Sequence, residues 1–357
     1  MTAVVTRRAA SGPRESDWSA AVAAVRELAP TGRVLLICHV NPDGDALGSM
    51  LAVALGLQRL RRLSAVRRSR LDGSAPEVQA TFAGEFDVPE PFAELPGIGL
   101  LVPEERAYPD PDLVMVFDVA AESRLGGLVD RLARARQTIV LDHHASNTGF
   151  GGINLVDPQA AATSVVAEQL LARLDVPLDA EIAECLYVAL ATDTGSFRFD
   201  MTTPRVHEMA ARLIATGIRP GEISRRIFDT RPFGAIKLFA EVLARAALDP
   251  TAAGGHGMVW TYATLEDLRR HGQRPYVMDA LIDPVRTVAE ADVAVLVKQV
   301  GATEWAVSLR SKGAVDVSLV AIAMGGGGHR LAAGFTGYGN PGDVVVAVRE
   351  QLDRHLI

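Results

Sequence analysis

The sequence has few cysteines, no long apolar run and no excess of positive charge, and each shortage excludes a class of protein. Its two cysteines, Cys38 and Cys185, lack the spacing of a metal knuckle or a disulfide framework. Both lie in apolar stretches, so we predict buried free thiols in a reducing cytoplasm. No apolar run of about 18 residues is free of charged side chains, so no membrane span is expected. The net charge of -7 argues against a broad electrostatic grip on long nucleic acid, but not against a small nucleotide held by metals.

The remaining composition is that of an ordinary globular protein. With 357 residues, of which 48% are hydrophobic and 22% charged, the chain is long enough for two domains. The first residues contain two arginines without an apolar region after them. They therefore predict a flexible N-terminal tail over residues 1–17, not a signal peptide.

Short apolar runs that end at an acidic or imidazole residue predict buried parallel strands. These runs are Val34–Cys38 before His39, Leu113–Phe117 before Asp118, and Thr138–Leu141 before Asp142. Helical patterns lie around them, over Trp18–Leu28, Ala46–Leu60, Ala160–Leu174, Ala180–Thr192 and Thr203–Gly217. Sites in such βα units lie at the carboxyl ends of the strands. We therefore predict an α/β fold whose N-terminal domain, residues 18–228, contains a parallel sheet and the catalytic site.

A different pattern begins near residue 229. Residues 229–250 predict a linker with a connecting helix, Ala235–Leu248, and residues 249–257 predict a loop of small residues. The elements predicted beyond them are the strands Met258–Tyr262, Val293–Gln299 and Glu304–Leu309, and the final helix Pro341–Leu356. We predict a smaller α/β C-terminal domain over residues 251–357, across a cleft from the first.

Residues 59–70 are unusually basic. The arginines of this segment are Arg59, Arg61, Arg62, Arg67, Arg68 and Arg70. One interpretation is a solvated helix end followed by an edge strand, and the other is a basic rim that faces a substrate. Composition alone favours the first interpretation and leaves the second open.

Acidic and histidine side chains gather at the predicted strand and helix ends. They are His39, Asp43, Asp45, Asp118, Asp142, His143, His144 and Asp193. Alone, each group also suits an ordinary turn, a helix cap or a solvated strand end, but together they favour a crevice that holds two divalent metals. We expect Asp43 and Asp45 to lie in an extended loop, turned by Pro42 and Gly44, so that each serves a different metal.

The mixture of carboxylates and imidazoles indicates which metal the site prefers and which reaction that metal supports. Carboxylate oxygen suits Mg²⁺ and Mn²⁺, and Mn²⁺ also accepts imidazole, so the residue types favour Mn²⁺. Two such metals can share a water that loses its proton near neutral pH and attacks a phosphate ester. The sequence therefore predicts a metal-dependent phosphoesterase that needs no serine or cysteine nucleophile.

A glycine-rich segment over residues 323–335 is the second strong signal. Consecutive glycines let backbone N–H groups point together at an anion, and His329 and Arg330 add donors or charge. The alternative is a linker or tight turn, but the flanking residues are apolar, whereas linkers are usually polar on both sides. Arg310 and Ser311, after a predicted strand, suit a second anion contact or an ordinary solvated strand end.

At these residues the chain resembles the DHH/DHHA1 phosphoesterase superfamily. The shared motifs, in family order, are HxNPDGDALGS, Asp118, Asp142-His143-His144, DTGSFRF and GGGGHRLAAGF, and the resemblance spans about residues 20–355. The size is similar to that of the nanoRNase and pAp-phosphatase (bifunctional oligoribonuclease) branch, including actinobacterial members that act on cyclic or linear di-nucleotides. One departure is the segment Ser64–Arg70, where the family usually has a hydrophobic second strand.

The resemblance implies a role for each site residue. One metal would be bound by His39, Asp43 and Asp118, and the second by Asp45, Asp118, His143 and Asp193, with Asp118 bridging. In catalysis, Asp142 would orient a histidine and His144 would contact the substrate phosphate. The substrate contacts in the second domain would be Arg310, Ser311, Gly326, Gly327, Gly328 and His329.

The expected activity is hydrolysis of short nucleotides with two Mn²⁺ per site, for which Mg²⁺ or Co²⁺ are substitutes. The substrates implied are oligoribonucleotides of roughly two to five units, 3′-phosphoadenosine 5′-phosphate, and cyclic or linear di-nucleotides. We expect a cytoplasmic homodimer with no membrane or long-duplex partner. The alternatives are an inorganic pyrophosphatase or exopolyphosphatase, a single-strand DNA exonuclease, and a nucleotide-binding protein without activity.

Overall fold

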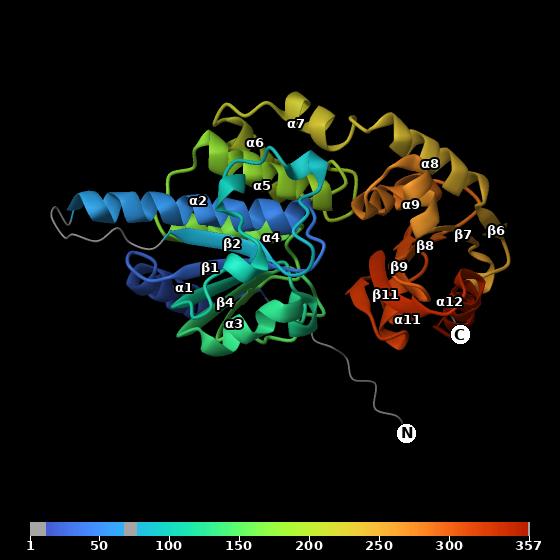
Figure 1. Ribbon diagram of the computed structural model, residues 1–357, viewed down its shortest axis with the longest axis horizontal. Coiled ribbons are helices and arrows are strands. Elements are labelled where there is room, and N and C mark those ends of the chain that lie inside the picture. The colour runs from blue at the N-terminus through green and yellow to red at the C-terminus, as the bar shows by residue number, and fades with distance from the viewer. Residues whose placement is uncertain (1–11, 68–76, 356–357) are drawn as a thin grey trace, which may run out of the picture. The chain divides into compact units, whose positions relative to one another are not determined.

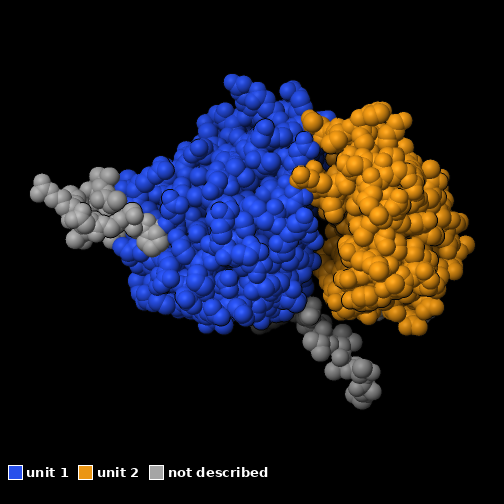
Figure 2. Space-filling model, viewed as in Figure 1, with its two compact units in different colours: residues 1–229 blue, residues 230–357 orange. Residues whose placement is uncertain are grey.

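Two separate sheets organise the chain, one in each of the two units into which its contacts divide it, residues 1–229 and 230–357 (Figure 2). The computed structural model describes residues 12–67 and 77–355. Within that part of the chain, each unit contains helices as well as strands (Figure 1). The α/β fold class predicted from the sequence is therefore confirmed. None of the described helices is both long and apolar enough to cross a membrane.

The sheet of the first unit is parallel throughout, and its described strands follow the order β2-β1-β3-β4-β5. The strands are β1 (Val34–Cys38), β2 (Val78–Phe82), β3 (Leu113–Phe117), β4 (Gln137–Asp142) and β5 (Ile153–Val156). The central strands β1 and β3 are buried at every position, as a sheet covered on both faces requires. On β1, Val34, Leu36 and Cys38 join one core, and Leu35 and Ile37 join another on the opposite face.

Helices cover both faces of this sheet. They are α1 (Glu15–Leu28), α2 (Gly44–Arg67), α3 (Val129–Arg134), α4 (Thr163–Arg173), α5 (Ala180–Asp193), α6 (Pro204–Ile214) and α7 (Pro220–Ile227), with short 3-10 turns between β2 and α3. Helices α2 and α5 lie side by side (Figure 1). Their close approach requires glycine, because a side chain at Gly48 would collide with the carbonyl oxygen of Cys185. Gly44, the first residue of α2, makes a similar close approach to Thr192 near the end of α5, so the start of α2 lies beside the end of α5.

The strands predicted at 34–38 and 113–117 are confirmed with the same bounds, and the strand predicted at 138–141 is one residue longer at each end. The first helix begins at Glu15, within the predicted flexible tail, where the Asp17 carboxylate accepts hydrogen bonds from the backbone N–H and the guanidinium of Arg14. Residues 1–11 of that tail lie outside the described residues.

The second strand expected at Ser64–Arg70 is wrong for residues 64–67, which continue α2. The strand at the sheet edge lies later, at β2, and residues 68–70 lie outside the described part. Arg59 contacts Asp179 and Glu181, and the Arg61 guanidinium donates to two backbone carbonyls of the α1–β1 connection. These two arginines therefore bind other residues of the first unit, as expected if the basic segment does not face a substrate.

The described sheet of the second unit has the order β10-β11-β9-β8-β7-β6, in which β7 and β8 are parallel and the other neighbours antiparallel. Its strands are β6 (Ala247–Asp249), β7 (Met258–Ala263), β8 (Val293–Gln299), β9 (Glu304–Ser311), β10 (Gly327–His329) and β11 (Ala332–Tyr338). Its helices are α8 (Phe233–Ala244), α9 (Leu265–His271), α10 (Ile282–Val285), α11 (Val317–Ala323) and α12 (Pro341–His355). Separate apolar clusters pack on its two faces.

Several predictions for the second unit need correction. The helix expected over 235–248 ends at Ala244, because residues 247–249 pair with β7 as strand β6. The loop expected over 249–257 therefore begins with the last residue of a strand and contains a 3-10 turn at Ala253–Gly255. The final helix starts at Pro341 as predicted, and its predicted last residue, Leu356, lies outside the described part.

Candidate metal centre

The predicted ligands of the first unit lie where three neighbouring parallel strands end. His39 follows β1, Asp118 follows β3, and Asp142 is the last residue of β4, with His143 and His144 directly after it. Since β1, β3 and β4 are adjacent and parallel, their carboxyl ends carry these side chains to one edge of the sheet. The expectation that separate strands bring them together is confirmed.

Helix ends supply the remaining ligands. Asp193 is the last residue of α5, and Asp43 directly precedes α2. The extended loop predicted for Asp43 and Asp45 is wrong, because Asp45 lies in the first turn of α2. Oδ1 of Asp43 accepts hydrogen bonds from the backbone N–H groups of Asp45 (3.1 Å) and Ala46 (3.0 Å), so Asp43 also caps this helix.

Three groups of side chains among the described residues of this unit have ligand atoms within 4.8 Å of one another. They are His39 with Asp43 and Asp118, Asp45 with Asp118 and His143, and Asp118 with Asp142 and His144. Oδ2 of Asp193 lies 3.1 Å from Nε2 of His143 and so adjoins the second group. Asp118 belongs to all three groups and stands at the centre of the cluster.

The carboxylate of Asp118 faces two histidines with different oxygens. Its Oδ2 lies 3.5 Å from Nε2 of His39, and its Oδ1 lies 3.5 Å from Nε2 of His143. The backbone of Asp118 is left-handed, with φ of 60°, and its N–H donates to the carbonyl of Leu141. This conformation is costly for residues other than glycine, and such strain clusters at functional sites.

The Nδ1 atoms of the three histidines are held by acceptors. Nδ1 of His39 lies 2.8 Å from the carbonyl of Val40, and Nδ1 of His143 lies 3.3 Å from the carbonyl of Ala160. A carbonyl only accepts, so each Nδ1 carries the hydrogen and Nε2 keeps the lone pair in the neutral ring. Histidines that bind metals are commonly oriented by such a bond on the other ring nitrogen.

Buried negative charge dominates the electrostatics of this cluster. Burial raises the pKa of Asp45 well above its usual value, and the charges of Asp193 and Asp118 raise it further. Burial opposes the charged form of His143, but its hydrogen bond to Asp193 and the nearby carboxylates outweigh that effect and raise its pKa well above the ordinary value. The cluster therefore favours added positive charge, and a donor set of carboxylates and imidazoles fits divalent metals.

Asp142 accepts hydrogen bonds on both of its carboxylate oxygens. It is fully buried, and its Oδ1 accepts from the backbone N–H of His143 (2.9 Å) and from Nδ1 of His144 (2.7 Å). Its Oδ2 accepts from the side-chain amide of Asn147 at 2.6 Å. Asn147 is not among the residues predicted from the sequence, and the only local signal for it is its position five residues after Asp142.

The predicted residues of the second unit lie on two strands, β10 and β9, on either side of β11. Gly326, Gly327, Gly328 and His329 form β10 and its approach, while Arg310 and Ser311 end β9. The intervening strand β11 pairs Ala332 with both His329 and Arg310. The glycine-rich segment is therefore part of a hairpin. The Ser311 hydroxyl donates to Asp292 at 2.8 Å, which gives it a contact inside this unit.

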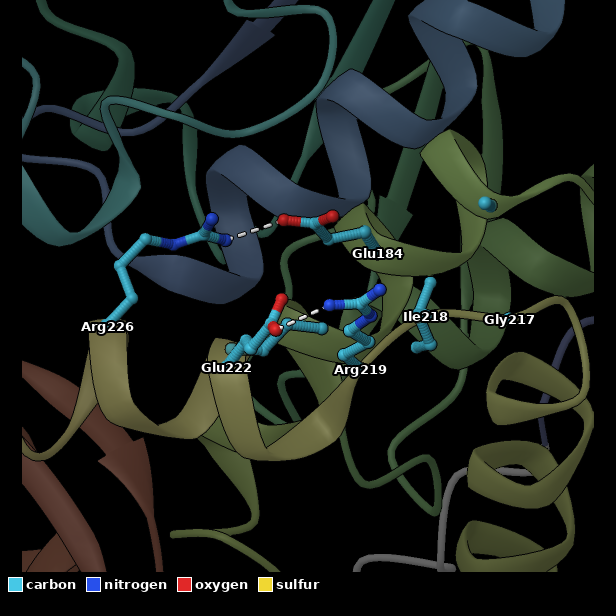
Figure 3. A pocket seen from close by; sticks show the side chains of 8 residues that line it. Glu184, Gly217, Ile218, Arg219, Glu222 and Arg226 are labelled. Atoms are coloured by element: carbon cyan, nitrogen blue, oxygen red, sulfur yellow. Dashed lines mark hydrogen bonds and ion pairs between the residues drawn. The ribbon is translucent and has the colours of Figure 1, made fainter.

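A separate hollow of about 220 Å³ lies in the first unit between α5 and the start of α7 (Figure 3). Its charged side chains pair with each other, since Arg226 donates to Glu184 at 2.7 Å and Arg219 donates to Glu222 at 2.8 Å. Glu184 and Asp193 are both on α5, about 13 Å apart along the helix axis. The charges of this hollow are balanced within it, and it is distinct from the carboxylate cluster.

Comparisons with known proteins match both units. The family model described as the DHH family, N-terminal domain, matches residues 33–190, and the DHHA1 domain model matches residues 257–354. The chain is 32% identical to the bifunctional oligoribonuclease and PAP phosphatase NrnA of Thermus thermophilus, over 90% of this chain and 91% of that protein. It is 24% identical to a probable protein of the same name from Streptococcus mutans, over 85% and 89% of the two chains.

A solved structure shares the fold. The crystal structure of an exopolyphosphatase-related protein from Bacteroides fragilis superposes with a TM-score of 0.79 at 20% identity. The match covers 96% of this chain and 97% of that one. The likeness therefore extends across both units.

Proposed function

Since the chain belongs to the DHH family, with a DHHA1 domain after its DHH domain, we propose that it is a two-metal phosphoesterase that hydrolyses short nucleotides. The observation that carries the proposal is the carboxylate of Asp118, whose two oxygens face the Nε2 atoms of His39 and His143. One carboxylate that faces two nitrogen donors in this way suits a bridge between two metals.

In this proposal, the first metal is bound by His39, Asp43 and Asp118. The second is bound by Asp45, Asp118, His143 and Asp193. Ligands that bind one metal at about 2.1 Å in tetrahedral or octahedral geometry lie about 3.0–3.4 Å from each other. The separation of His143 from Asp193 (3.1 Å) lies in this range and that of His39 from Asp118 (3.5 Å) lies just above it, which supports this assignment.

In this proposal the protein's own residues orient the substrate, and bound metals would activate the attacking water. Two metals bound here would supply a hydroxide at neutral pH and would stabilise the charge that develops on the phosphoryl oxygens. Asp142 fixes the ring of His144 through Nδ1, so that Nε2 of His144 is the atom that contacts the substrate phosphate. We propose Mn²⁺ because carboxylates and imidazoles share the site, with Mg²⁺ or Co²⁺ as substitutes.

The substrate class rests on the relatives. The Thermus thermophilus protein is named for oligoribonuclease and PAP phosphatase activities, and its similarity extends over nearly the whole of both chains. We propose that this chain acts on short oligoribonucleotides, on 3′-phosphoadenosine 5′-phosphate, or on di-nucleotides. Residues 18–228 would carry the catalytic metals. Within residues 251–357, Arg310 and the glycine-rich hairpin would bind the nucleotide.

A product assay tests the proposal. The protein is incubated with Mn²⁺ and a linear di-nucleotide, 3′-phosphoadenosine 5′-phosphate, a cyclic di-nucleotide or pyrophosphate. We expect turnover of nucleotides, abolished by chelation, and little turnover of pyrophosphate. Asp118→Ala should lower kcat/KM by about a thousandfold or more because both metals lose a ligand, whereas Asp130→Ala, an exposed change on α3, should not alter it. Turnover of pyrophosphate alone, or an active Asp118→Ala enzyme, would contradict the proposal.

A further inference from the structure

We infer that Thr163 positions Asp45 and Asp118 for the second metal, and that Asp45 binds this metal through Oδ2 alone. The inference rests on the two-metal function proposed above and adds residues that bind no metal themselves. Thr163 is the first residue of α4 and is fully buried. It contacts both carboxylates, one through its backbone and one through its side chain.

The start of α4 lacks a cap of its own. The N-cap residue is Ala162, whose side chain has no acceptor, so the first N–H groups of the helix need another partner. Asp45 provides it from α2: its Oδ2 accepts from the N–H of Thr163 at 2.6 Å, and its Oδ1 accepts from the N–H of Ser164 at 3.1 Å. A carboxylate at this end of a helix is also favoured by the helix dipole.

These bonds determine which oxygen of Asp45 remains available to a metal. Oδ1 accepts a second hydrogen bond, from the Ser49 hydroxyl at 2.8 Å, so both of its lone pairs are used. Oδ2 has one such bond, from Thr163, and lies 3.8 Å from Nε2 of His143. Asp45 can therefore bind the metal beside His143 with one oxygen only.

The Thr163 hydroxyl acts on the bridging carboxylate. It donates to Oδ1 of Asp118 at 3.0 Å, and this is the same oxygen that faces His143. The bond limits rotation of the Asp118 carboxylate and leaves Oδ1 a lone pair for the second metal. Because threonine is stiff about χ1, its hydroxyl is held in place by the helix. Outer partners of this kind typically change metal affinity by about tenfold to a hundredfold.

Mn²⁺ binding to the full chain tests the inference without relying on activity. Free Mn²⁺ is measured by electron paramagnetic resonance as each variant is titrated, and the rise in Tm on adding Mn²⁺ is recorded in parallel. Thr163→Val replaces the hydroxyl with a methyl group, and Thr163→Ser keeps the hydroxyl. Thr81→Val is the matched control, because Thr81 is equally buried in the same unit and its hydroxyl donates to the backbone carbonyl of Val102.

We expect Thr163→Val to weaken one of two Mn²⁺ sites by about tenfold to a hundredfold, with Thr163→Ser within about threefold of the unchanged chain. A purely structural role for Thr163 would lower the Tm of the metal-free protein, as we expect of Thr81→Val, but leave the Mn²⁺ affinity intact. An unchanged isotherm for Thr163→Val would overturn the inference.

Thr163→Ala keeps the test decisive if Thr163→Val does not fold. It removes the same hydroxyl donor to Asp118 without adding a methyl group beside that carboxylate, so it should weaken the same Mn²⁺ site, and an unchanged isotherm would overturn the inference. Mn²⁺ binding to the unchanged chain distinguishes a failure of this inference from a failure of the proposed function. If it fails to bind two Mn²⁺, the two-metal function itself is wrong. If it binds two and the variants bind equally well, only the role of Thr163 is wrong.

Discussion

The side-chain amide of Asn147 donates a hydrogen bond to Oδ2 of the buried Asp142, at 2.6 Å, and a second to the carbonyl of Val119 at 3.0 Å. Asp142 in turn accepts from Nδ1 of His144. The three side chains form a hydrogen-bonded chain that fixes the orientation of the His144 ring through its Nδ1 atom. In our account Asn147 contacts no substrate itself, but it sets the orientation of His144, which we propose contacts the substrate phosphate.

Asn147→Ala should lower kcat by about tenfold to a hundredfold, because Asp142 loses a donor and His144 its fixed orientation. The control is Asn154→Ala, since Asn154 holds the backbone of the same loop through Gly151 but does not contact Asp142. Steady-state kinetics on a di-nucleotide compare the two variants. Equal losses in both would show that the loop alone matters and would contradict the role of Asn147.

Gly48→Ala should destabilise the first unit by about 1–3 kcal/mol, because the new methyl group would overlap the Cys185 carbonyl and the Ala189 side chain. The matched control is Gly221→Ala on α7, where an added Cβ meets nothing within 4 Å. That change should stabilise the protein by up to about 1 kcal/mol through helix propensity. Urea unfolding of the metal-free protein measures both. Stabilisation by Gly48→Ala would contradict the close packing of α2 on α5.

Stability of the second unit should depend on pH through Asp267, which pairs with Arg245 at 2.7 Å. Burial alone would raise the pKa of Asp267, but the bonds from Arg245 and Thr264 outweigh it and hold the pKa below its usual value. A carboxyl whose pKa is lowered by folding stabilises the fold above its unfolded pKa of about 3.9, and this contribution is lost as pH falls through the folded value.

Asp267→Asn should therefore cost about 1.5–3 kcal/mol at pH 7, and the difference from the unchanged chain should shrink below about pH 4. Unfolding in urea as a function of pH measures both effects. Asp283→Asn is the control, because its ion pair with Arg286 is 56% exposed at the carboxylate and should contribute little. A cost for Asp267→Asn that stays constant down to pH 3 would contradict the linkage.

Arg310→Ala should raise KM for a short nucleotide by about tenfold while changing kcat less, because in our proposal Arg310 binds the substrate phosphate and holds no metal. Arg286→Ala is the control on the same unit, since its guanidinium pairs with Asp283. Kinetics over a range of di-nucleotide concentrations separate the two constants. A fall in kcat with unchanged KM would contradict the binding role.

The proposed ligands were predictable because each lies at a terminus of a strand or helix, where the periodicity of the apolar residues changes. β1 and β3 have continuous apolar sequences, and that pattern identifies a buried parallel strand without any knowledge of its neighbours. His39 and Asp118 follow from them directly. The strand order of a parallel sheet then brings these residues to one edge.

The remaining features depend on contacts with no local signal. The bond from Thr163 to Asp45 joins residues 118 positions apart, and nothing in either segment alone predicts it. The glycine-rich sequence of β10 does not predict a strand, because glycine is depleted in strands, yet pairing with β11 makes it one. β6 is a three-residue strand that exists only because β7 lies beside it. Tertiary pairing decides all three.

The most direct test of the central claim is anomalous diffraction from crystals grown with Mn²⁺. The account predicts two anomalous peaks in the first unit, about 3.5–4 Å apart, with one oxygen of Asp118 bound to each. His39 should contact one peak and His143 the other. A single peak, or two peaks that Asp118 does not join, would contradict the two-metal account.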